Sequence, residues 1–268
     1  MRTAIMGILN VTPDSFSDGG RFSSTDAAVE EARCLIAEGA HILDIGGEST
    51  RPGAQPVPEG VELERVLPVL EALAPQSQAR LSIDTMKPNV ADACLRAGAS
   101  LINDVTGLRD PRMAQVAASH GAGVVIMHTR GTPRTMAEHA RYSDLIGDIK
   151  AELSPRIRSA RDAGVREIIV DPGIGFAKTA AQSLEILRRL REFEELGCPI
   201  LIGPSRKSFL GTLAGMEAAD ARLEGTLAAV VIGAMNGASL VRVHDVLACH
   251  KALSVVDAVK GTEWTRSF

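Results

Sequence analysis

The feature that most constrains the fold is an alternation, along the whole chain, between short apolar runs of strand length and longer segments with helical periodicity. Strands separated by helices form parallel sheets, because each helix carries the chain back across a face of the sheet. Eight runs occur, each followed by one helical segment. The expected strands are 4–10, 41–45, 80–84, 101–103, 123–127, 168–171, 199–202 and 239–242, and the expected helices are 25–38, 59–74, 87–96, 113–120, 143–163, 181–195, 222–236 and 245–259.

Glycines at the junctions support this count. Gly39, Gly98, Gly121, Gly164 and Gly237 each stand between an expected helix and the next strand, where a left-handed C-cap residue is favoured. The 268 residues match the size of one eight-stranded α/β barrel. We therefore predict a (β/α)₈ TIM barrel of the α/β class, with a single domain over 1–268. A doubly wound open sheet is the alternative, but the first strand is not followed by a G-x-G-x-x-G turn.

Composition and charge exclude several classes of function. The net charge is −4, and lysine and arginine are dispersed rather than clustered, which disfavours a nucleic-acid partner. The four cysteines lie far apart and form no C-x-x-C pair, so we expect reduced, mostly buried thiols and neither disulfides nor zinc. No stretch approaches 18 apolar residues, so we expect no membrane segment and a cytoplasmic protein.

Polar side chains stand at the ends of nearly all the expected strands. In barrels of this type the active site lies at the carboxyl ends of the strands, so these positions predict a ring of functional groups. The ring comprises Asn10, Asp44, Asp84, Asn103, His128, Asp171, Lys207, Arg242 and His244.

Structural roles compete with functional ones at four positions around this ring. Asp44 lies in an apolar strand and is as compatible with bonding to neighbouring backbone as with touching substrate, so it is not a candidate here. Asp104 points away from its neighbour Asn103 and is expected to cap local backbone. Asp245 is expected to cap the last helix, and His128 fits a structural or a functional role equally.

Two segments indicate an anion site. Ser49, Thr50 and Arg51 place hydroxyl, backbone and guanidinium donors on one glycine-flanked loop. Arg242 and His244 are two residues apart, so both face the same side of the last strand. The alternative is that the two arginines pair with acidic loop residues. No P-loop or G-x-S-x-G motif accompanies these donors, which disfavours nucleotide or ester hydrolysis.

A second set of residues suits a flat, nitrogen-rich ring. Asp84, Asn103, Asp171 and Lys207 come from different strands and converge on the barrel mouth. A carboxylate accepts two parallel N–H bonds from a 2-amino-pyrimidinone edge as it does from a guanidinium, and lysine can face the ring carbonyl.

Seven motifs together resemble the dihydropteroate synthase family, and the resemblance covers the whole chain. They are GILNVTPDSFSDGG (7–20), DIGGESTRPG (44–53), SIDT (82–85), INDV (102–105), DPGIGF (171–176), SRKSF (205–209) and RVHD (242–245). The resemblance implies a TIM barrel that joins 6-hydroxymethyl-7,8-dihydropterin pyrophosphate to p-aminobenzoate. It also implies Mg²⁺ as cofactor, a homodimer, and a transferase of folate biosynthesis that is a sulfonamide target.

The resemblance also assigns roles to residues. Catalysis falls to Asp84, Lys207, Arg242 and His244. The pterin would contact Asp84, Asn103, Val105, Met127, Asp171, Phe176, Gly203, Lys207 and Arg242. Pyrophosphate would contact Asn10, Thr50, Arg51, Arg242 and His244, with Asn10 also a metal ligand. p-Aminobenzoate would contact Phe16, Asp18, Ser49, Pro52 and Ser208.

Departures from the family pattern are few. Ala177 stands where a glycine is expected, Gln182 and Ser183 replace an expected His-Asn pair, and Thr129 follows His128 where Met or Asn is frequent. Segments of about 11–21 and 46–58 are rich in Gly, Ser, Asp and Pro, which predicts mobile loops over the site.

Two other functions fit part of the pattern. A pterin-dependent corrinoid methyltransferase would share Asp84, Asn103 and Asp171 but has no use for the anion-binding residues. A non-catalytic pterin-binding paralogue would be expected to lose one of the two long loops, and both are intact. The sequence therefore favours a synthase that ionises the C–O bond of the pterin pyrophosphate.

Overall fold

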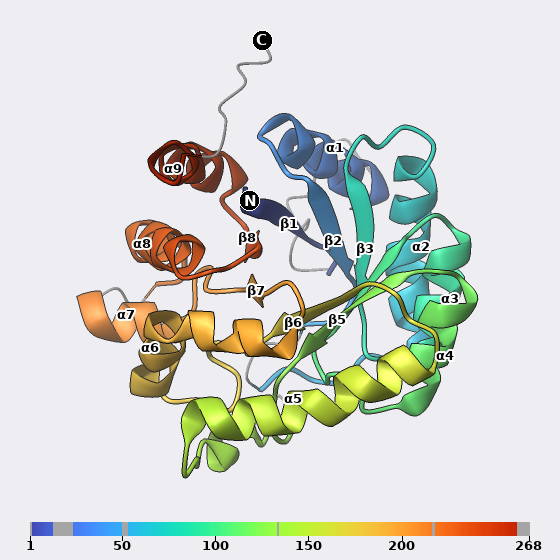
Figure 1. Ribbon diagram of the computed structural model, residues 1–268. Helices are drawn as coiled ribbons and strands as arrows, with labels where there is room; N and C mark the ends of the chain where they lie inside the picture. Colours follow the sequence, from blue (N-terminus) through green and yellow to red (C-terminus); the bar gives the residue numbers. More distant parts are fainter. Residues whose placement is uncertain (1, 13–23, 50–52, 133, 216–217, 262–268) are drawn as a thin grey trace.

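Eight parallel strands surrounded by helices form the molecule, as the computed structural model shows (Figure 1). The structure describes residues 2–12, 24–49, 53–132, 134–215 and 218–261. The strands are β1 (Ala4–Asn10), β2 (Ile42–Gly46), β3 (Arg80–Asp84), β4 (Leu101–Asp104), β5 (Gly123–Met127), β6 (Ile168–Asp171), β7 (Leu201–Ile202) and β8 (Leu240–Val243).

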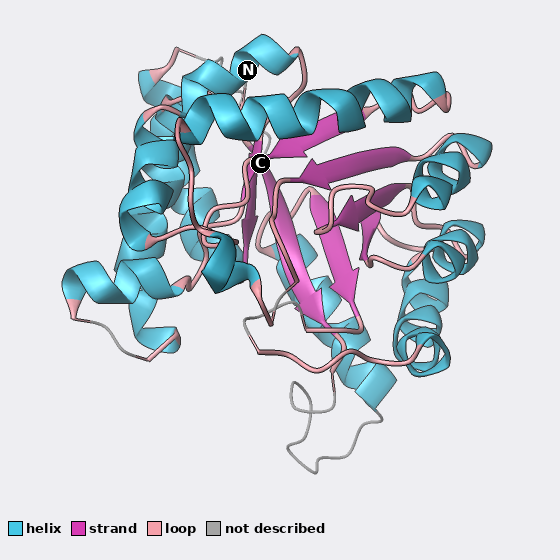
Figure 2. Cartoon of the chain, turned by 90° about the horizontal axis from the view of Figure 1, so that it is seen from below, coloured by secondary structure: helices cyan, strands magenta, loops and turns pink. Residues whose placement is uncertain are grey.

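The strands close into a barrel. Their order is β6-β5-β4-β3-β2-β1-β8-β7, and a parallel bridge between Val170 and Ile200 joins the two ends of this series. Closure confirms the predicted (β/α)₈ TIM barrel, and the open-sheet alternative is wrong. Figure 2 shows the strands at the centre with helices packed around them.

The helices follow the predicted alternation with shifts of a few residues at their ends. They are α1 (Ser24–Ala37), α2 (Glu59–Leu73), α3 (Pro88–Arg96), α4 (Pro111–Ser119), α5 (Leu145–Asp162), α6 (Ala180–Arg188), α7 (Ser208–Ala214), α8 (Leu223–Met235) and α9 (Val246–Val259). The seven-residue α7 was not predicted. The segment 181–195 was predicted as one helix, but Arg189 (φ −106°, ψ 19°) leaves helical geometry, and a 3₁₀ helix follows over Leu190–Leu196.

The junction glycines have the predicted left-handed geometry. All five have φ between 64° and 115°. At Gly98 the space is as limiting as the φ angle, because a Cβ there would lie 2.6 Å from Cβ of Ala74. Glycine is therefore required where the chain turns tightly from α3 into β4.

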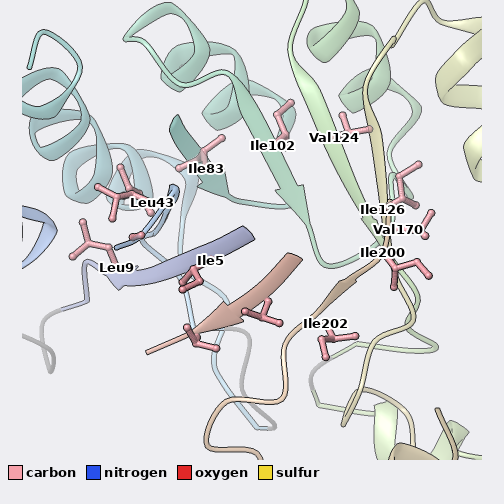
Figure 3. Close-up of a cluster of buried hydrophobic side chains, with 14 of the residues drawn as sticks. Ile5, Leu9, Leu43, Ile83, Ile102, Val124, Ile126, Val170, Ile200 and Ile202 are labelled. Atoms are coloured by element: carbon pink, nitrogen blue, oxygen red, sulfur yellow. The ribbon is translucent and has the colours of Figure 1, made fainter. Parts of the chain in front are cut away.

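Two apolar layers hold the barrel together. The larger lies between the strands and the helices, and Figure 3 shows part of it, including Ile5, Leu43 and Ile83. The smaller fills the barrel interior at the amino-terminal ends of the strands, where a core side chain from seven of the eight strands points inward: Met6, Ile42, Leu101, Val125, Ile169, Leu201 and Leu240. The carboxyl ends remain for polar groups.

The structure also describes the cysteines and the apolar character of the helices. All four cysteines are free thiols, although Cys34 is exposed while Cys94 and Cys249 are buried. In the described part of the chain, no helix is both long and apolar enough to cross a membrane.

Candidate active site

The interior of the barrel changes from apolar to polar within two residues along several strands. Ile42 is followed two positions later by Asp44, Leu101 by Asn103, Ile169 by Asp171 and Leu240 by Arg242. Since side chains alternate between the two faces of a strand, each polar residue points to the same side as the apolar one before it. These side chains therefore converge in the barrel above the apolar plug.

Asp44 is the centre of this polar layer. Its fully buried carboxylate accepts hydrogen bonds from Ser82 Oγ (2.6 Å), Asn103 Nδ2 (2.8 Å) and Arg242 Nε (2.6 Å). Asp44 thus binds side chains from three other strands. The sequence alone suggested only bonds to neighbouring backbone or contact with a substrate. Because the amide nitrogen of Asn103 faces Asp44, its carbonyl oxygen is the atom left for a ligand.

Asp84 combines one ion pair with one unsatisfied oxygen. Oδ2 accepts from Nη2 of Arg242 at 2.6 Å, while Oδ1 is buried and has no hydrogen-bond partner among the described residues. Burial raises the pKa of Asp84 to about 7, because the nearby guanidinium offsets only part of the desolvation. A buried carboxylate oxygen without a donor marks a position where a ligand N–H would be stabilised.

Asp171 lies at the end of β6 and is fixed by the following loop. Its Oδ1 accepts from the backbone N–H of Gly173 at 2.7 Å. Burial raises its pKa to about 6, against the opposing effects of that hydrogen bond and of Lys207. Lys207 Nζ lies 3.8 Å from the ring centroid of Phe176, a cation–π contact. Three predicted pterin contacts therefore lie within one small region.

His244 is held by a residue that sequence reasoning missed. Ser205 Oγ lies 3.0 Å from Nδ1 of His244 and accepts from its backbone N–H at 3.2 Å. The serine belongs to the SRKSF motif after β7, so its proximity in sequence to Lys207 was the available signal. Only the contact between the ends of β7 and β8 shows what Ser205 binds.

A cavity of about 830 Å³ is lined by Val105 and Phe176 but by none of the buried polar side chains described above. It contains the predicted residues Ser49, Val105 and Phe176, and it is completed by side chains from other loops that were not predicted, including Met86, Thr129, Arg109, Arg134 and Met136. Its size suits an organic ligand rather than a single ion.

The remaining predicted residues are distributed around the barrel mouth. Asn10 ends β1 and is half-buried, Met127 ends β5 and is buried, and Gly203 follows β7. A Cβ on Gly203 would lie 3.8 Å from Cβ of Arg242, so the two are neighbours. Ser208 is exposed at the start of α7. Phe16, Asp18, Thr50, Arg51 and Pro52 lie outside the described residues.

The structure decides between the structural and functional roles considered for Asp104, Asp245 and His128. Asp104 does cap local backbone, since it accepts from the N–H groups of Thr106 (2.8 Å) and Leu108 (3.0 Å). The prediction for Asp245 is wrong: it precedes α9 but makes no capping bond, because its carboxylate pairs with Arg206 at 2.7 Å. His128 is fully buried in a hydrogen-bonded cluster.

The ligand set for a metal is small. Within the described ranges no group of three or more histidine, cysteine, aspartate or glutamate side chains is arranged to hold an ion. Asn10 offers one amide oxygen, which suits a magnesium ion that keeps most of its waters and binds phosphate oxygens.

Comparisons with known proteins identify the family of this chain. Residues 6–244 match the family model described as pterin binding enzyme. A dihydropteroate synthase from Synechocystis is 47% identical over 261 residues, covering 96% of this chain and 90% of that protein. The dihydropteroate synthase of Xanthomonas albilineans, solved with 4-aminobenzoic acid, superposes with a TM-score of 0.92 at 45% identity and covers 98% and 94% of the two chains. The Yersinia pestis enzyme, solved as a sulfonamide drug complex, gives 0.91 at 42% identity, covering 97% and 95%.

Proposed function

The chain belongs to the pterin-binding enzyme family, and we propose that it is a transferase with dihydropteroate synthase activity. It joins 6-hydroxymethyl-7,8-dihydropterin pyrophosphate to p-aminobenzoate and releases 7,8-dihydropteroate and pyrophosphate. The fold alone would not support this, because TIM barrels host many reactions. The observation that carries the proposal is the pair of buried carboxylates, Asp84 and Asp171, at the barrel mouth.

The two carboxylates and Asn103 complement a pterin ring. Asp84 Oδ1 needs a donor, and the ring nitrogens and the 2-amino group of a pterin supply N–H groups. The carbonyl oxygen of Asn103 accepts a further N–H because its nitrogen is bound to Asp44. Lys207, beside Phe176, can donate to the ring carbonyl.

Arg242 can serve the pterin and the leaving group together. Two of its five N–H groups bind Asp44 and Asp84, which leaves three for an anion. Cleavage of the C–O bond puts negative charge on pyrophosphate and positive charge on the pterin methylene. Arg242 and His244 would stabilise the first, and the ionised Asp84 the second. The neutral aryl amine then attacks the methylene carbon, and the acidic anilinium that forms releases its proton to water, so no side chain needs to act as a general base.

Magnesium is proposed as the cofactor because the substrate carries a pyrophosphate and Asn10 offers an amide oxygen, both of which bind this ion. The half-buried amide oxygen of Asn10, at the end of β1, would be its protein ligand. When bound, the ion would neutralise charge on the departing pyrophosphate. Asn10 would then orient the pyrophosphate toward the ends of β1 and β8, which pair in register.

A homodimer and a cytoplasmic location are also proposed. Exposed apolar side chains on the adjacent helices α8 and α9, namely Ile232, Met235, Leu247, Val255 and Val259, would be covered by a second copy. Such side chains favour association when they gather on one face. Sedimentation equilibrium of the wild type and of Val255→Glu tests this, and a monomeric wild type would contradict it.

One incubation tests the proposed reaction. The protein is mixed with Mg²⁺ and both substrates, and pyrophosphate and dihydropteroate are measured together. Equal amounts of the two products are expected. Release of neither, with pterin still bound, would indicate a non-catalytic binding protein, and methyl transfer to a corrinoid would indicate the other alternative.

The order of binding sharpens the proposal. p-Aminobenzoate should bind measurably only when Mg²⁺ and pyrophosphate are present, since the anion-binding residues flank its predicted contacts. A sulfonamide should compete with it and be consumed slowly as an alternative nucleophile. Equal p-aminobenzoate affinity with and without pyrophosphate would contradict this order.

A further inference from the structure

A chain of charged and polar side chains lies behind the candidate site, between the end of β5, α5 and the loop after β6. Lys178 Nζ donates to the carbonyl oxygen of Phe176 (2.9 Å) and lies 3.0 Å from Nδ1 of His128. Nε2 of His128 lies 3.1 Å from Glu152 Oε2, and Arg130 Nε donates to Glu152 Oε1 at 2.9 Å. The proposed reaction uses none of Lys178, His128, Glu152 and Arg130.

The direction of these hydrogen bonds follows from the chemistry of Lys178. Burial lowers the pKa of Lys178 to about 7, and in its ammonium form the side chain only donates. His128 then accepts at Nδ1, carries its proton on Nε2 and donates to Glu152. Burial and the surrounding cations lower the pKa of His128 to about 2, which keeps the imidazole neutral. His128 therefore acts as a fixed connector rather than as an acid or a base.

The loop that Lys178 holds is packed against two of the site's elements. A Cβ on Gly173 would lie 2.0 Å from the carbonyl oxygen of His128, and one on Gly175 would lie 3.3 Å from Cδ of Lys207. The same loop donates the Gly173 N–H to Asp171 and presents the Phe176 ring to Lys207. A shift of this loop would therefore move Asp171, Phe176 and Lys207 relative to one another.

The loop conformation also needs to be held in place. Ala177 has φ of 49°, a left-handed conformation that is unfavourable for alanine. Two side chains bind consecutive carbonyl oxygens here: Lys178 binds that of Phe176, and Tyr142 Oη donates to that of Ala177 at 3.0 Å. Strained backbone persists only where its surroundings fix it.

We propose that Lys178 is the positioning residue for the pterin half of the site. By binding the Phe176 carbonyl oxygen and His128, it fixes the loop 172–177 against the end of β5 and so sets the geometry of Asp171, Phe176 and Lys207. Lys178 acts through these residues and does not contact the substrate. The inference rests on the proposed function, because it assumes that the pterin binds there.

The test compares Lys178→Met with Lys150→Met, in which a lysine of α5 that pairs with Glu195 is replaced. The dissociation constant of 6-hydroxymethylpterin is measured by calorimetry, and KM is measured for both substrates. For Lys178→Met we expect at least a tenfold rise in the pterin dissociation constant and KM, with the KM for p-aminobenzoate changed less than twofold. Lys178→Arg, which keeps the donors, should recover part of the loss, and Lys150→Met should match the wild type.

Two results would overturn the proposal. One is a folded Lys178→Met protein whose pterin affinity stays within twofold of the wild type, and the other is an equal rise in both KM values. If Lys178→Met does not fold, Glu152→Gln is tested instead, because it weakens the hydrogen bond between Glu152 and His128. Pterin binding about threefold weaker than that of the wild type would support the proposal, and unchanged binding would refute it. A wild type that binds no pterin would refute the proposed function itself.

Discussion

The two ends of the barrel interior are built from the same strands but obey different rules. At the amino-terminal end the inward side chains are buried, apolar and mutually packed, as at Met6, Ile42 and Leu201. At the carboxyl end the inward side chains include three buried carboxylates, Asp44, Asp84 and Asp171, and the half-buried guanidinium of Arg242 pairs with the first two. The amino-terminal end stabilises the fold by burying apolar surface, whereas the carboxyl end contains charged groups whose desolvation is unfavourable.

Backbone strain follows the same division. Three described residues other than glycine have positive φ: Leu108 (58°), Ala177 (49°) and Arg206 (57°). They lie in the loops after β4, β6 and β7, all on the polar side of the barrel. Apolar packing at the amino-terminal end therefore stabilises the fold, whereas buried charge and strained backbone at the carboxyl end destabilise it, as expected of a functional site.

Replacing the shared cation should have the largest effect. Arg242→Ala leaves Asp44 and Asp84 without their ion pair, and breaking such a buried pair costs about 3–5 kcal/mol. The loss should be largest at pH 8, where Asp84 would be ionised, and smaller at pH 5, where Asp84 can take up a proton because burial raises its pKa to about 7. Urea unfolding at both pH values measures it, and an equal loss at both would contradict the charge explanation.

The same variant tests catalysis. Arg242→Ala should slow product formation far more than it weakens binding of the pterin alcohol, because its remaining N–H groups would serve the leaving group. Equal losses of rate and of alcohol affinity would instead make Arg242 a contact of the ring alone.

The apolar end should respond only in stability. Leu201→Ala removes a fully buried side chain of the plug and should lower the free energy of unfolding by about 2–5 kcal/mol. Its cost should be the same at pH 5 and pH 8, because no titratable group is involved. Calorimetric pterin affinity below the unfolding temperature should stay within a few-fold of the wild type, and a larger change would mean that the two ends are not separable.

Removing a carboxylate at the polar end should weaken pterin binding without lowering stability. Asp171→Asn presents a donor where acceptors are needed and should weaken pterin binding by about 1–3 kcal/mol, roughly 5- to 150-fold. Stability at pH 8 should not fall, since the buried charge is gone. Asp92→Asn on α3 is the control, and calorimetry with thermal unfolding gives both quantities. Near-normal affinity would remove Asp171 from the pocket.

The pH dependence should separate affinity from stability in the wild type. Burial raises the pKa of Asp84 to about 7 and that of Asp171 to about 6. Because the folded state binds these protons more tightly than the unfolded state, the protonated carboxyls favour folding. This contribution is complete below the unfolded pKa near 3.8 and is lost as the pH rises through 6 to 7. Pterin affinity should run the other way and fall about tenfold from pH 7.5 to pH 6, because the ionised forms accept the ring N–H groups. Affinity that is constant over this range would contradict the assignment.

The smallest effect should come from relieving strain at the polar end. Ala177→Gly removes the cost of a left-handed alanine but increases the freedom of the unfolded chain, so we expect a net gain of about 0.5–1 kcal/mol. Differential scanning calorimetry should show a Tm higher by about 1–3 °C. A lower Tm would mean that the methyl group packs usefully in the loop.

Much of the site could be predicted because strand ends are visible in the sequence. Asp84, Asn103 and Asp171 end apolar runs, and a barrel brings all such ends to one face. Asp44 was set aside because its neighbours are apolar, and its three side-chain partners lie 38, 59 and 198 residues away. No local pattern reports contacts at such separations.

The sequence by itself determined the barrel, since eight alternations of two periodicities have few other ways to bury their apolar faces. It also determined which residues reach the mouth, because the two-residue period of a strand fixes the side on which each one points. Only the tertiary structure decided how those residues pair. Closing the barrel places β8 beside β1, so that Arg242 lies between Asp44 and Asp84, and it sets Lys178 behind the loop that carries Phe176. Such pairings depend on distances of a few ångströms between distant segments, which the packing of the whole barrel sets and the order of residues does not encode locally.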